Sequence, residues 1–269
     1  MKSCEVLSAP MSAQGIGRYE LDGNGGVNVL KPEFQHTTHQ CERADDTGEQ
    51  VMKHYLFLDV DGVLHPLNEK HLPSLVDPKD LLQRVDEEEK AGDALEVVRV
   101  LSGEFHPPIL SCLAKVLNDT AAKVDVILSS TWRQTLPGRR AVEGQLSAAA
   151  LPALSGCTPM LWAARRCRRC HEILEFLVDH HRPRGTPFRF CVLDDDDLCE
   201  GDEEDHAASF VRPHFIRCQK SEGLTEEDAA RALSTLGDEG PTAHLTDDVV
   251  SRVEADRRAR RAEEEDGEM

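Results

Sequence analysis

The stretch Tyr55-Leu56-Phe57-Leu58-Asp59-Val60-Asp61-Gly62-Val63-Leu64 decides how the rest of the chain is interpreted. An unbroken apolar run that ends in acids and a glycine predicts a buried strand of a parallel sheet, followed by a sharp turn. Ligands of open α/β sheets bind just beyond the carboxyl ends of such strands. Two carboxylates this close repel each other unless a cation or hydrogen-bond donors hold their charge. The stretch therefore predicts a site at Asp59 and Asp61.

Composition limits the classes of protein that this chain fits. It has 269 residues, of which 39% are hydrophobic and only 4% aromatic, so we expect one core with disordered ends. The formal charge of −19 disfavours non-specific binding to nucleic acid or to an anionic membrane, although a bound metal ion can invert the field locally. No apolar segment approaches the about 20 residues of a membrane span, and the N-terminus lacks a signal-peptide core. Nine cysteines, an odd number, favour free thiols in a reducing, cytoplasmic setting.

The chain divides by composition into three parts. We expect a disordered polar segment over residues 1–51, an α/β domain over 52–236, and an acidic charged tail over 237–269. Within the domain, residues 65–104 are polar and loop-rich, which predicts an insert or a minimal cap. The tail contains Arg257-Arg258-Ala259-Arg260-Arg261, a weak nuclear-import pattern whose flanking acids favour an exposed, self-paired helix instead.

Helical and strand patterns alternate through the domain, which predicts a central parallel sheet between helices. The architecture expected is a Rossmann-like three-layer sandwich with a small or absent cap. Further strands are predicted at Val124–Leu128 and Phe188–Leu193, and a short strand at His214–Ile216. Helices are predicted from Pro107 to Asn118-Asp119, over Cys167–His180, and after an N-cap at Thr225. A looser helical pattern covers Gln134–Leu154, with an interruption at Pro137-Gly138.

Polar residues follow three of these strands. They are Asp59 and Asp61, then Ser129 and Ser130, then the run from Asp194 to Asp197; a helix that begins with Arg165, Arg166, Arg168 and Arg169 lies between the second and third groups. Because the carboxyl ends of parallel strands point the same way, we expect these groups to converge on one crevice. Carboxylates, a hydroxyl and a guanidinium together suit a phosphoryl group bound with Mg²⁺.

The order of these groups resembles the haloacid dehalogenase (HAD) superfamily of phosphohydrolases, over roughly residues 52–236. Three details are similar to the subgroup found in Swiss-army-knife RNA repair proteins. They are Ser129-Ser130-Thr131-Trp132-Arg133, Arg169-Cys170-His171-Glu172-Ile173, and Gly223-Leu224-Thr225 followed by Asp228.

The resemblance implies a role for each site residue. Asp59 would attack phosphorus and form an aspartyl-phosphate, and Asp61 would protonate the leaving oxygen and then help to deprotonate water. Ser129 would bind a phosphoryl oxygen, as would the amides of Val60 and Asp61. Arg169 would offset phosphoryl charge, a position where the family usually has Lys. Mg²⁺ would bind Asp59, the backbone carbonyl of Asp61, and an acid of the third group, with Asp195 favoured and Asp194 as second ligand or close neighbour.

Several alternatives stay open at this point. Arg165, Arg166 or Arg168 could serve in place of Arg169, and Asp196 and Asp197 are the less favoured metal acids. Trp132 and His65 are interpreted as packing and loop residues rather than substrate contacts.

Two metal alternatives are disfavoured. A calcium loop does not fit, because Val63 stands where a ligand is needed. Zinc at Cys167-x-x-Cys170-His171 is disfavoured because no further cysteine lies at a recognised spacing.

The function predicted is a Mg²⁺-dependent phosphatase that acts on a phosphorylated substrate, with a nucleic-acid end or another macromolecular phosphoester favoured by the resemblance and by an open site. A non-catalytic phosphate-binding module and a phosphotransferase are the competing hypotheses. No membrane partner is expected, and the sequence leaves the oligomeric state open.

Overall fold

The computed structural model describes residues 20–21, 27–28, 52–67, 105–161, 167–181, 185–199 and 204–267. The chain divides into two units, Met1–Gln50 and Val51–Met269. In the first unit, β1 (Glu20–Leu21) and β2 (Val27–Asn28) form an antiparallel pair. The rest of the segment predicted to be disordered, and residues 68–104 of the predicted insert, lie outside the described residues.

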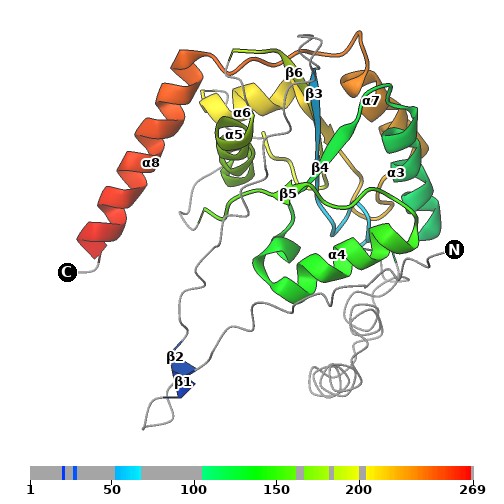
Figure 1. Cartoon of the computed structure of the whole chain (residues 1–269), viewed down its shortest axis with the longest axis horizontal. Helices are drawn as coiled ribbons and strands as arrows, with labels where there is room; N and C mark the ends of the chain where they lie inside the picture. The colour runs from blue at the N-terminus through cyan, green and yellow to red at the C-terminus, as the bar shows by residue number, and fades with distance from the viewer. Residues whose placement is uncertain are drawn as a thin grey trace, which may run out of the picture. The chain divides into compact units, whose positions relative to one another are not determined.

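The second unit is built on a five-stranded parallel sheet with the order β5-β4-β3-β6-β7 (Figure 1). The strands are β3 (Lys53–Leu58), β4 (Val124–Leu128), β5 (Gly156–Cys157), β6 (Phe188–Asp194) and β7 (Phe215–Arg217). The strands predicted from apolar runs are therefore confirmed, and β3 occupies the centre. Strand β5 was not predicted, because two residues at the sheet edge carry no periodic signal.

Helices cover both faces of the sheet, so the predicted three-layer α/β architecture is confirmed (Figure 1). They are α3 (Pro107–Asp119), α4 (Leu136–Ala148), α5 (Arg168–His180), α6 (His206–Val211), α7 (Glu226–Leu236) and α8 (Asp247–Gly267), with short 3₁₀ turns η1 (Thr131–Gln134) and η2 (Arg212–His214). Residues of α3, α4 and α7 pack on one face, and residues of α5, α6 and α8 on the other.

Alternate side chains of the central strand β3 pack into the hydrophobic clusters on the two faces of the sheet. Leu56 and Leu58 join the α3, α4 and α7 side, whereas Tyr55 and Phe57 join the α5, α6 and α8 side. Successive side chains of a strand point to opposite faces, so an all-apolar strand must be covered twice. This double burial fixes the end of β3, and with it Asp59, in the middle of the sheet edge.

The loose helix predicted over Gln134–Leu154 is wrong in its bounds. Thr135 caps the helix by accepting a hydrogen bond from the Gly138 N–H at 3.1 Å, and proline stands in the first turn, where its missing N–H is tolerated. The helix ends at Ala148, before Ala150 adopts a φ of 55°. Pro137 therefore lies in the first turn of α4 and does not interrupt it.

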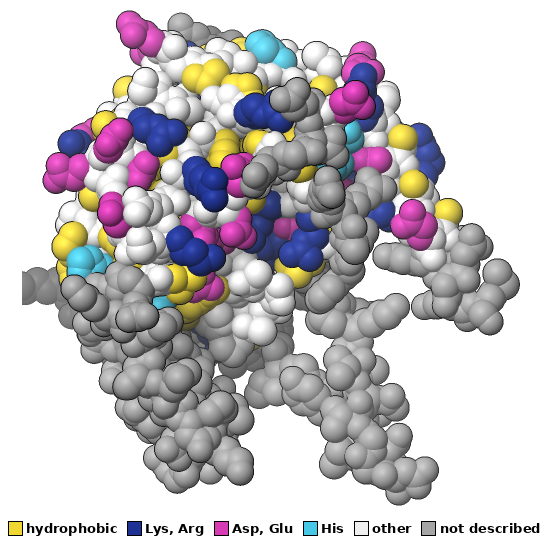
Figure 2. All heavy atoms as spheres, turned by 180° about the vertical axis from the view of Figure 1, so that it is seen from behind, with side chains coloured by type: hydrophobic (Ala, Val, Ile, Leu, Met, Phe, Trp, Pro, Cys, Tyr) yellow, Lys and Arg dark blue, Asp and Glu magenta, His cyan; other side chains and the backbone are white. Residues whose placement is uncertain are grey.

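The C-terminal segment, predicted to be a charged tail, also contributes apolar side chains to the core. Helix α8 places Val250 and Val253 in the same core cluster as Ala243 and Leu245, so the C-terminal residues pack against the domain. The domain boundary at residue 236 stays a prediction. No helix in the described ranges is long and apolar enough to cross a membrane. On the face seen in Figure 2, basic and acidic side chains are interspersed.

Candidate active site

The backbone of the sheet continues one residue past β3 and holds Asp59 in place. The Asp59 N–H donates to the Leu193 carbonyl at 3.0 Å, and the Ser129 N–H donates to the Leu58 carbonyl at 2.8 Å. Asp59 therefore lies between the ends of β4 and β6. The three strand ends that the sequence singled out do meet at one edge of the sheet.

A tight turn follows Asp59 and packs on the loop after β6. The carbonyl of Val60 accepts hydrogen bonds from the N–H groups of Leu64 at 2.8 Å and His65 at 2.9 Å. Gly62 has a φ of +78°, and a Cβ on it would lie 2.4 Å from Cγ of Asp195. Only glycine allows this backbone conformation and this close approach together.

Three carboxylates form the centre of the site. Asp59, Asp194 and Asp195 are all buried, and an oxygen of each lies within 4.8 Å of the others. Burial, reinforced by Asp194, raises the pKa of Asp59 to about 8. Burial likewise raises the pKa of Asp194 to about 6, despite the opposing effect of Arg169. Such a cluster is unfavourable unless a cation neutralises it.

This cluster fits a hard cation. The Asp194 Oδ2 is buried and makes no hydrogen bond within the described part of the chain, although it forms an ion pair with Arg169 at 3.3 Å. Carboxylate oxygens are the ligands that Mg²⁺ prefers. The side chain of Asp61 is not part of the cluster, so its proposed ligation through the backbone carbonyl stays a prediction.

Arg169, in the first turn of α5, binds the cluster. Its Nη1 lies 2.9 Å from Oδ1 of Asp59 and 3.3 Å from Oδ2 of Asp194. Arg168 instead pairs with Glu172, with 3.6 Å between Nε and Oε1, and its side chain is 41% exposed. Arg165 and Arg166 lie outside the described residues. Of the described arginines proposed from sequence, Arg169 is the one that contacts Asp59.

Ser129 supplies a buried hydroxyl at the end of β4. The residue is fully buried, and its Oγ has no hydrogen-bond partner among the described residues. A buried polar atom normally has a partner, so this hydroxyl is available to a ligand. The neighbouring hydroxyl of Ser130 is used within the fold, because its Oγ accepts from the Trp132 N–H at 3.4 Å and caps η1.

Asp61 lies apart from the three carboxylates and has its own donors. The Trp132 Nε1–H donates to its Oδ2 at 2.9 Å, and His65 Nδ1 lies 3.8 Å from its Oδ1. Burial raises the pKa of Asp61, but nearby His65 and the hydrogen bond from Trp132 outweigh burial and leave the pKa below its ordinary value. Trp132 thus contacts a site residue, which the packing interpretation of the sequence missed.

A buried ion pair between Arg133 and Glu172 supports the elements that carry the site residues. Arg133 Nη2 lies 2.5 Å from Oε2 of Glu172, and Arg133 Nη1 donates to the carbonyls of Ser129 at 3.1 Å and Ser130 at 2.6 Å. Arg133 also donates to the Thr158 carbonyl at 3.1 Å. The pair joins the end of β4 to α5, so it positions Ser129 and Arg169 relative to each other. Both residues lie in motifs that resemble the subgroup, but the sequence alone indicated no role for either.

The four consecutive aspartates separate clearly in the structure. Asp194 and Asp195 are buried in the carboxylate cluster, whereas Asp196 and Asp197 are exposed. Lys220 Nζ lies 3.1 Å from Oδ2 of Asp195, and Arg217 Nη1 lies 3.0 Å from Oδ2 of Asp197. Lys220, which no motif had suggested, therefore places a cation at the rim of the site.

Residues 55–229 match the sequence model of a protein family described as the HAD domain in Swiss Army Knife RNA repair proteins. The chain belongs to this family. Membership supports a HAD-type phosphohydrolase in general.

Two solved structures show a more distant likeness. They are the HAD domain of effector protein Lem4 from Legionella pneumophila and an inactive mutant of that domain, at 13% and 12% sequence identity. Each match covers 70% of this chain and 96% of the other, with a TM-score of 0.37. A search of curated proteins found no match.

Proposed function

We propose that this HAD-type domain is a Mg²⁺-dependent phosphohydrolase that acts through an aspartyl-phosphate on Asp59. The observation that carries the proposal is the position of Asp59. It is buried at the end of the central strand, 2.9 Å from the Arg169 guanidinium, and shares a carboxylate cluster with Asp194 and Asp195. A nucleophile, a positive charge and a cation site are the components that phosphoryl transfer requires.

Asp59, Asp194 and Asp195 would hold the Mg²⁺, with the backbone carbonyl of Asp61 as a further ligand. When bound, the ion supplies positive charge that offsets the repulsion between the carboxylates and an anionic phosphoryl group. Binding would also favour the ionised form of Asp59, whose pKa burial otherwise raises to about 8. An ionised Asp59 is the form that can attack phosphorus.

The proposed reaction has two half-reactions, formation and hydrolysis of the aspartyl-phosphate, and each side chain has a role in them. Asp59 attacks phosphorus while Asp61 gives a proton to the departing alcohol oxygen, and Ser129 and Arg169 bind phosphoryl oxygens. In the second half-reaction Asp61 takes a proton from water, the water oxygen attacks phosphorus, and the Asp59 carboxylate leaves with release of phosphate.

The lowered pKa of Asp61 suits the second half-reaction, in which this carboxylate is the base. An arriving phosphoryl dianion raises the pKa of a nearby carboxyl group and thereby favours the protonated form needed in the first half-reaction.

The substrate that we favour is a phosphorylated polynucleotide end. The family is named for RNA repair proteins, and cationic side chains stand beside the cluster although the whole chain is acidic. Lys220 and Arg217 have side chains that are 58% and 57% exposed next to the loop after β6. Exposed cations at the rim suit a chain of phosphates better than a neutral substrate.

The test uses the full chain with p-nitrophenyl phosphate and with oligonucleotides phosphorylated at the 5′ or the 3′ end. We expect Mg²⁺-dependent release of phosphate that falls by at least about 10³-fold in Asp59→Asn. Asp119→Asn, an exposed acid at the end of α3, is the matched control and should retain wild-type activity.

Two results would count against the proposal. Equal inertness of wild type and Asp59→Asn on every substrate, with phosphate analogues still bound, would favour a non-catalytic phosphate-binding module. Transfer of the phosphoryl group to added alcohols in preference to water would favour a phosphotransferase.

A further inference from the structure

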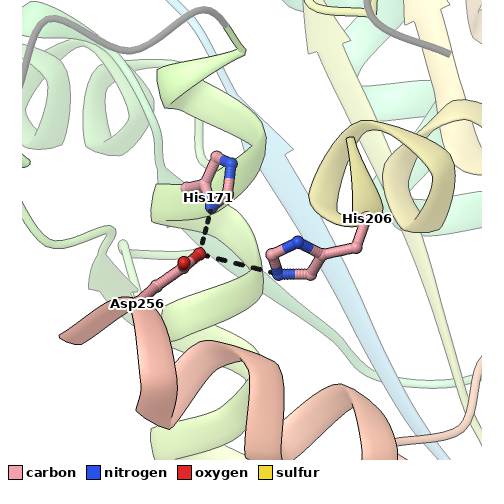
Figure 3. A group of neighbouring side chains, drawn as sticks. All are labelled: His171, His206 and Asp256. Carbon is pink, nitrogen blue, oxygen red and sulfur yellow. Dashed lines mark ion pairs between the residues drawn. The ribbon is translucent and has the colours of Figure 1, made fainter. Parts of the chain in front are cut away.

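A second polar cluster lies on the α5, α6 and α8 side of the sheet. His171 of α5, His206 of α6 and Asp256 of α8 point toward one another (Figure 3). His171 Nδ1 lies 3.4 Å and His206 Nε2 lies 3.8 Å from Oδ2 of Asp256. The function proposed above uses none of these residues.

Charge pairing alone accounts poorly for this cluster. Both distances to Asp256 exceed those of a strong charge-assisted hydrogen bond, about 2.7–2.9 Å. His206 Nε2 is buried and makes no hydrogen bond within the described residues. A buried imidazole nitrogen that makes no hydrogen bond is available as a metal ligand.

The orientation of His171 is already fixed from its other side. Its Nε2 lies 2.8 Å from Oδ2 of Asp205, while Oδ1 of Asp205 accepts from the Ala208 N–H at 2.8 Å and caps α6. A histidine that donates one ring N–H to a carboxylate presents the other nitrogen as a lone pair. This carboxylate–histidine arrangement is the usual support of a metal-binding histidine. Here it leaves Nδ1 facing Asp256.

We propose that His171, His206 and Asp256 form a binding site for a transition-metal ion of the zinc class, separate from the Mg²⁺ site. Bonds of about 2.0–2.1 Å in a tetrahedron place ligand atoms about 3.3 Å apart. The distances of 3.4 Å and 3.8 Å to Asp256 lie close to that value. Three protein ligands leave the fourth position to water. Imidazole nitrogen favours zinc over magnesium, so the chemistry of the two sites separates their ions.

The site would fasten the C-terminal helix to the domain. Asp256 lies on α8, beyond residue 229, where the family match ends. Helix α8 is also held by Arg257, whose Nη2 lies 2.8 Å from Oδ2 of Asp179 on α5. A metal ion would add a link among three helices that only the folded chain brings together. It would therefore stabilise the packing of α5, the helix that also carries Arg169.

The cysteine motif beside His171 belongs to the core instead. Cys170 is fully buried, and its Sγ contacts the Leu198 carbonyl at 3.3 Å. The partners of His171 in the cluster are His206 and Asp256, which lie on two other helices. They are too far from His171 in the sequence to form a local motif with it. The zinc site that we propose therefore shares one residue with the disfavoured cysteine motif.

The test measures zinc binding by the full chain after chelation, in the presence of excess Mg²⁺. We expect one tightly bound Zn²⁺ by elemental analysis, and an unfolding temperature that rises with Zn²⁺ concentration. Asp256→Asn and His206→Gln, which keep size and polarity, should lose this ion and this rise. Asp205→Asn should weaken the affinity by about 10- to 100-fold, because it still caps α6 but supports His171 less well. His244→Ala, an exposed histidine, should behave as wild type.

Cobalt substitution identifies the ligands independently of any variant. Co²⁺ in the wild-type chain should show the visible absorption of a tetrahedral site without a thiolate charge-transfer band. The proposal is overturned if the wild type binds no Zn²⁺, if Asp256→Asn and His206→Gln bind it as tightly as wild type, or if the thiolate band appears. Should one variant not fold, the other variant and the cobalt spectrum still decide.

Discussion

Arg169 makes an ion pair with Asp59, with 2.9 Å between Nη1 and Oδ1, across the end of the central strand. The same guanidinium nitrogen lies 3.3 Å from Oδ2 of Asp194, so one positive charge faces two buried carboxylates. Asp195 belongs to the same cluster and pairs with Lys220, so two positive side chains face three carboxylates. The ionised site therefore keeps a net negative charge that suits a further cation.

Arg169→Ala should lower kcat/KM by about 10²- to 10³-fold, the usual loss when a preorganised charge is removed from a transition state. Arg169→Lys should lose less than about tenfold, because it keeps the charge but not the fork of donors. Steady-state kinetics on p-nitrophenyl phosphate will compare the two. Equal losses in both variants would show that the shape of the guanidinium matters, and not its charge.

The site residues differ in how far the sequence revealed them. Asp59, Ser129 and Asp194 each end an apolar strand, and parallel pairing brings such ends together, so local pattern was enough to predict their meeting. Trp132, Arg133, Glu172 and Lys220 act through contacts between segments far apart in the chain. Such contacts depend on side-chain direction and packing, which periodicity does not encode. The bounds of α4 differed for a local reason, the cap at Thr135.

Gly62→Ala should destabilise the fold by about 2–4 kcal/mol. The change adds a side chain at positive φ and places its Cβ 2.4 Å from Cγ of Asp195, so it combines backbone strain with overcrowding. Gly185→Ala is the matched control, because Gly185 has a φ of +82° but open space around it. It should cost only about 1 kcal/mol. Urea unfolding will measure both, and equal costs would refute the proposed contact with Asp195.

Mg²⁺ should stabilise the folded chain, and more strongly as the pH rises. Without a cation, the folded pKa values of Asp59 and Asp194, about 8 and about 6, lie above the ordinary 3.8, so folding takes up protons. The stability that these two carboxyl groups contribute to the metal-free chain is then fully present below about pH 4 and declines as the pH rises through about 6 to 8. Mg²⁺ takes the place of these protons and offsets the decline.

Thermal unfolding with and without Mg²⁺ will test this relation across the pH range. At pH 8 and at 100 times the dissociation constant, we expect a rise of about 5–10 °C. Asp194→Asn should remove most of the rise, and Asp196→Asn, an exposed acid of the same run, should keep it. A rise that is the same at acidic and alkaline pH would contradict the proposed competition between protons and metal.

His214 should make the fold sensitive to acid. It is buried against Phe190, where its Nδ1–H donates to the Phe190 carbonyl at 3.1 Å, and burial lowers its pKa from 6.5 to about 4. Because the unfolded chain binds the proton more readily, this contribution to stability is fully present above about pH 6.5 and is lost as the pH falls toward about 4. The loss amounts to about 3 kcal/mol.

Urea unfolding as a function of pH will measure the effect of His214. His214→Gln keeps a donor for the carbonyl but does not titrate, so its stability should change less between about pH 6.5 and 4 than that of wild type. His244→Ala, at an exposed position, should follow the wild-type curve. An unchanged slope in His214→Gln would place the acid sensitivity elsewhere.

Trp132→Phe should move the pH–rate profile to higher pH. The Trp132 Nε1–H donates to Oδ2 of Asp61 at 2.9 Å and stabilises the ionised carboxylate. Phenylalanine keeps the aromatic contact with Phe105 but has no donor, so the pKa of Asp61 should rise. Loss of a hydrogen bond to a charged group should also lower kcat/KM by about tenfold.

The limb of the pH–rate profile that shifts is the informative result. If Asp61 acts as a base in the limiting step, the acidic limb of the profile moves to higher pH; if it acts as an acid, the alkaline limb moves the same way. Trp132→Phe should thus differ from Arg169→Lys, which changes rate without touching Asp61. A profile that keeps its position, or moves to lower pH, would remove Asp61 from proton transfer.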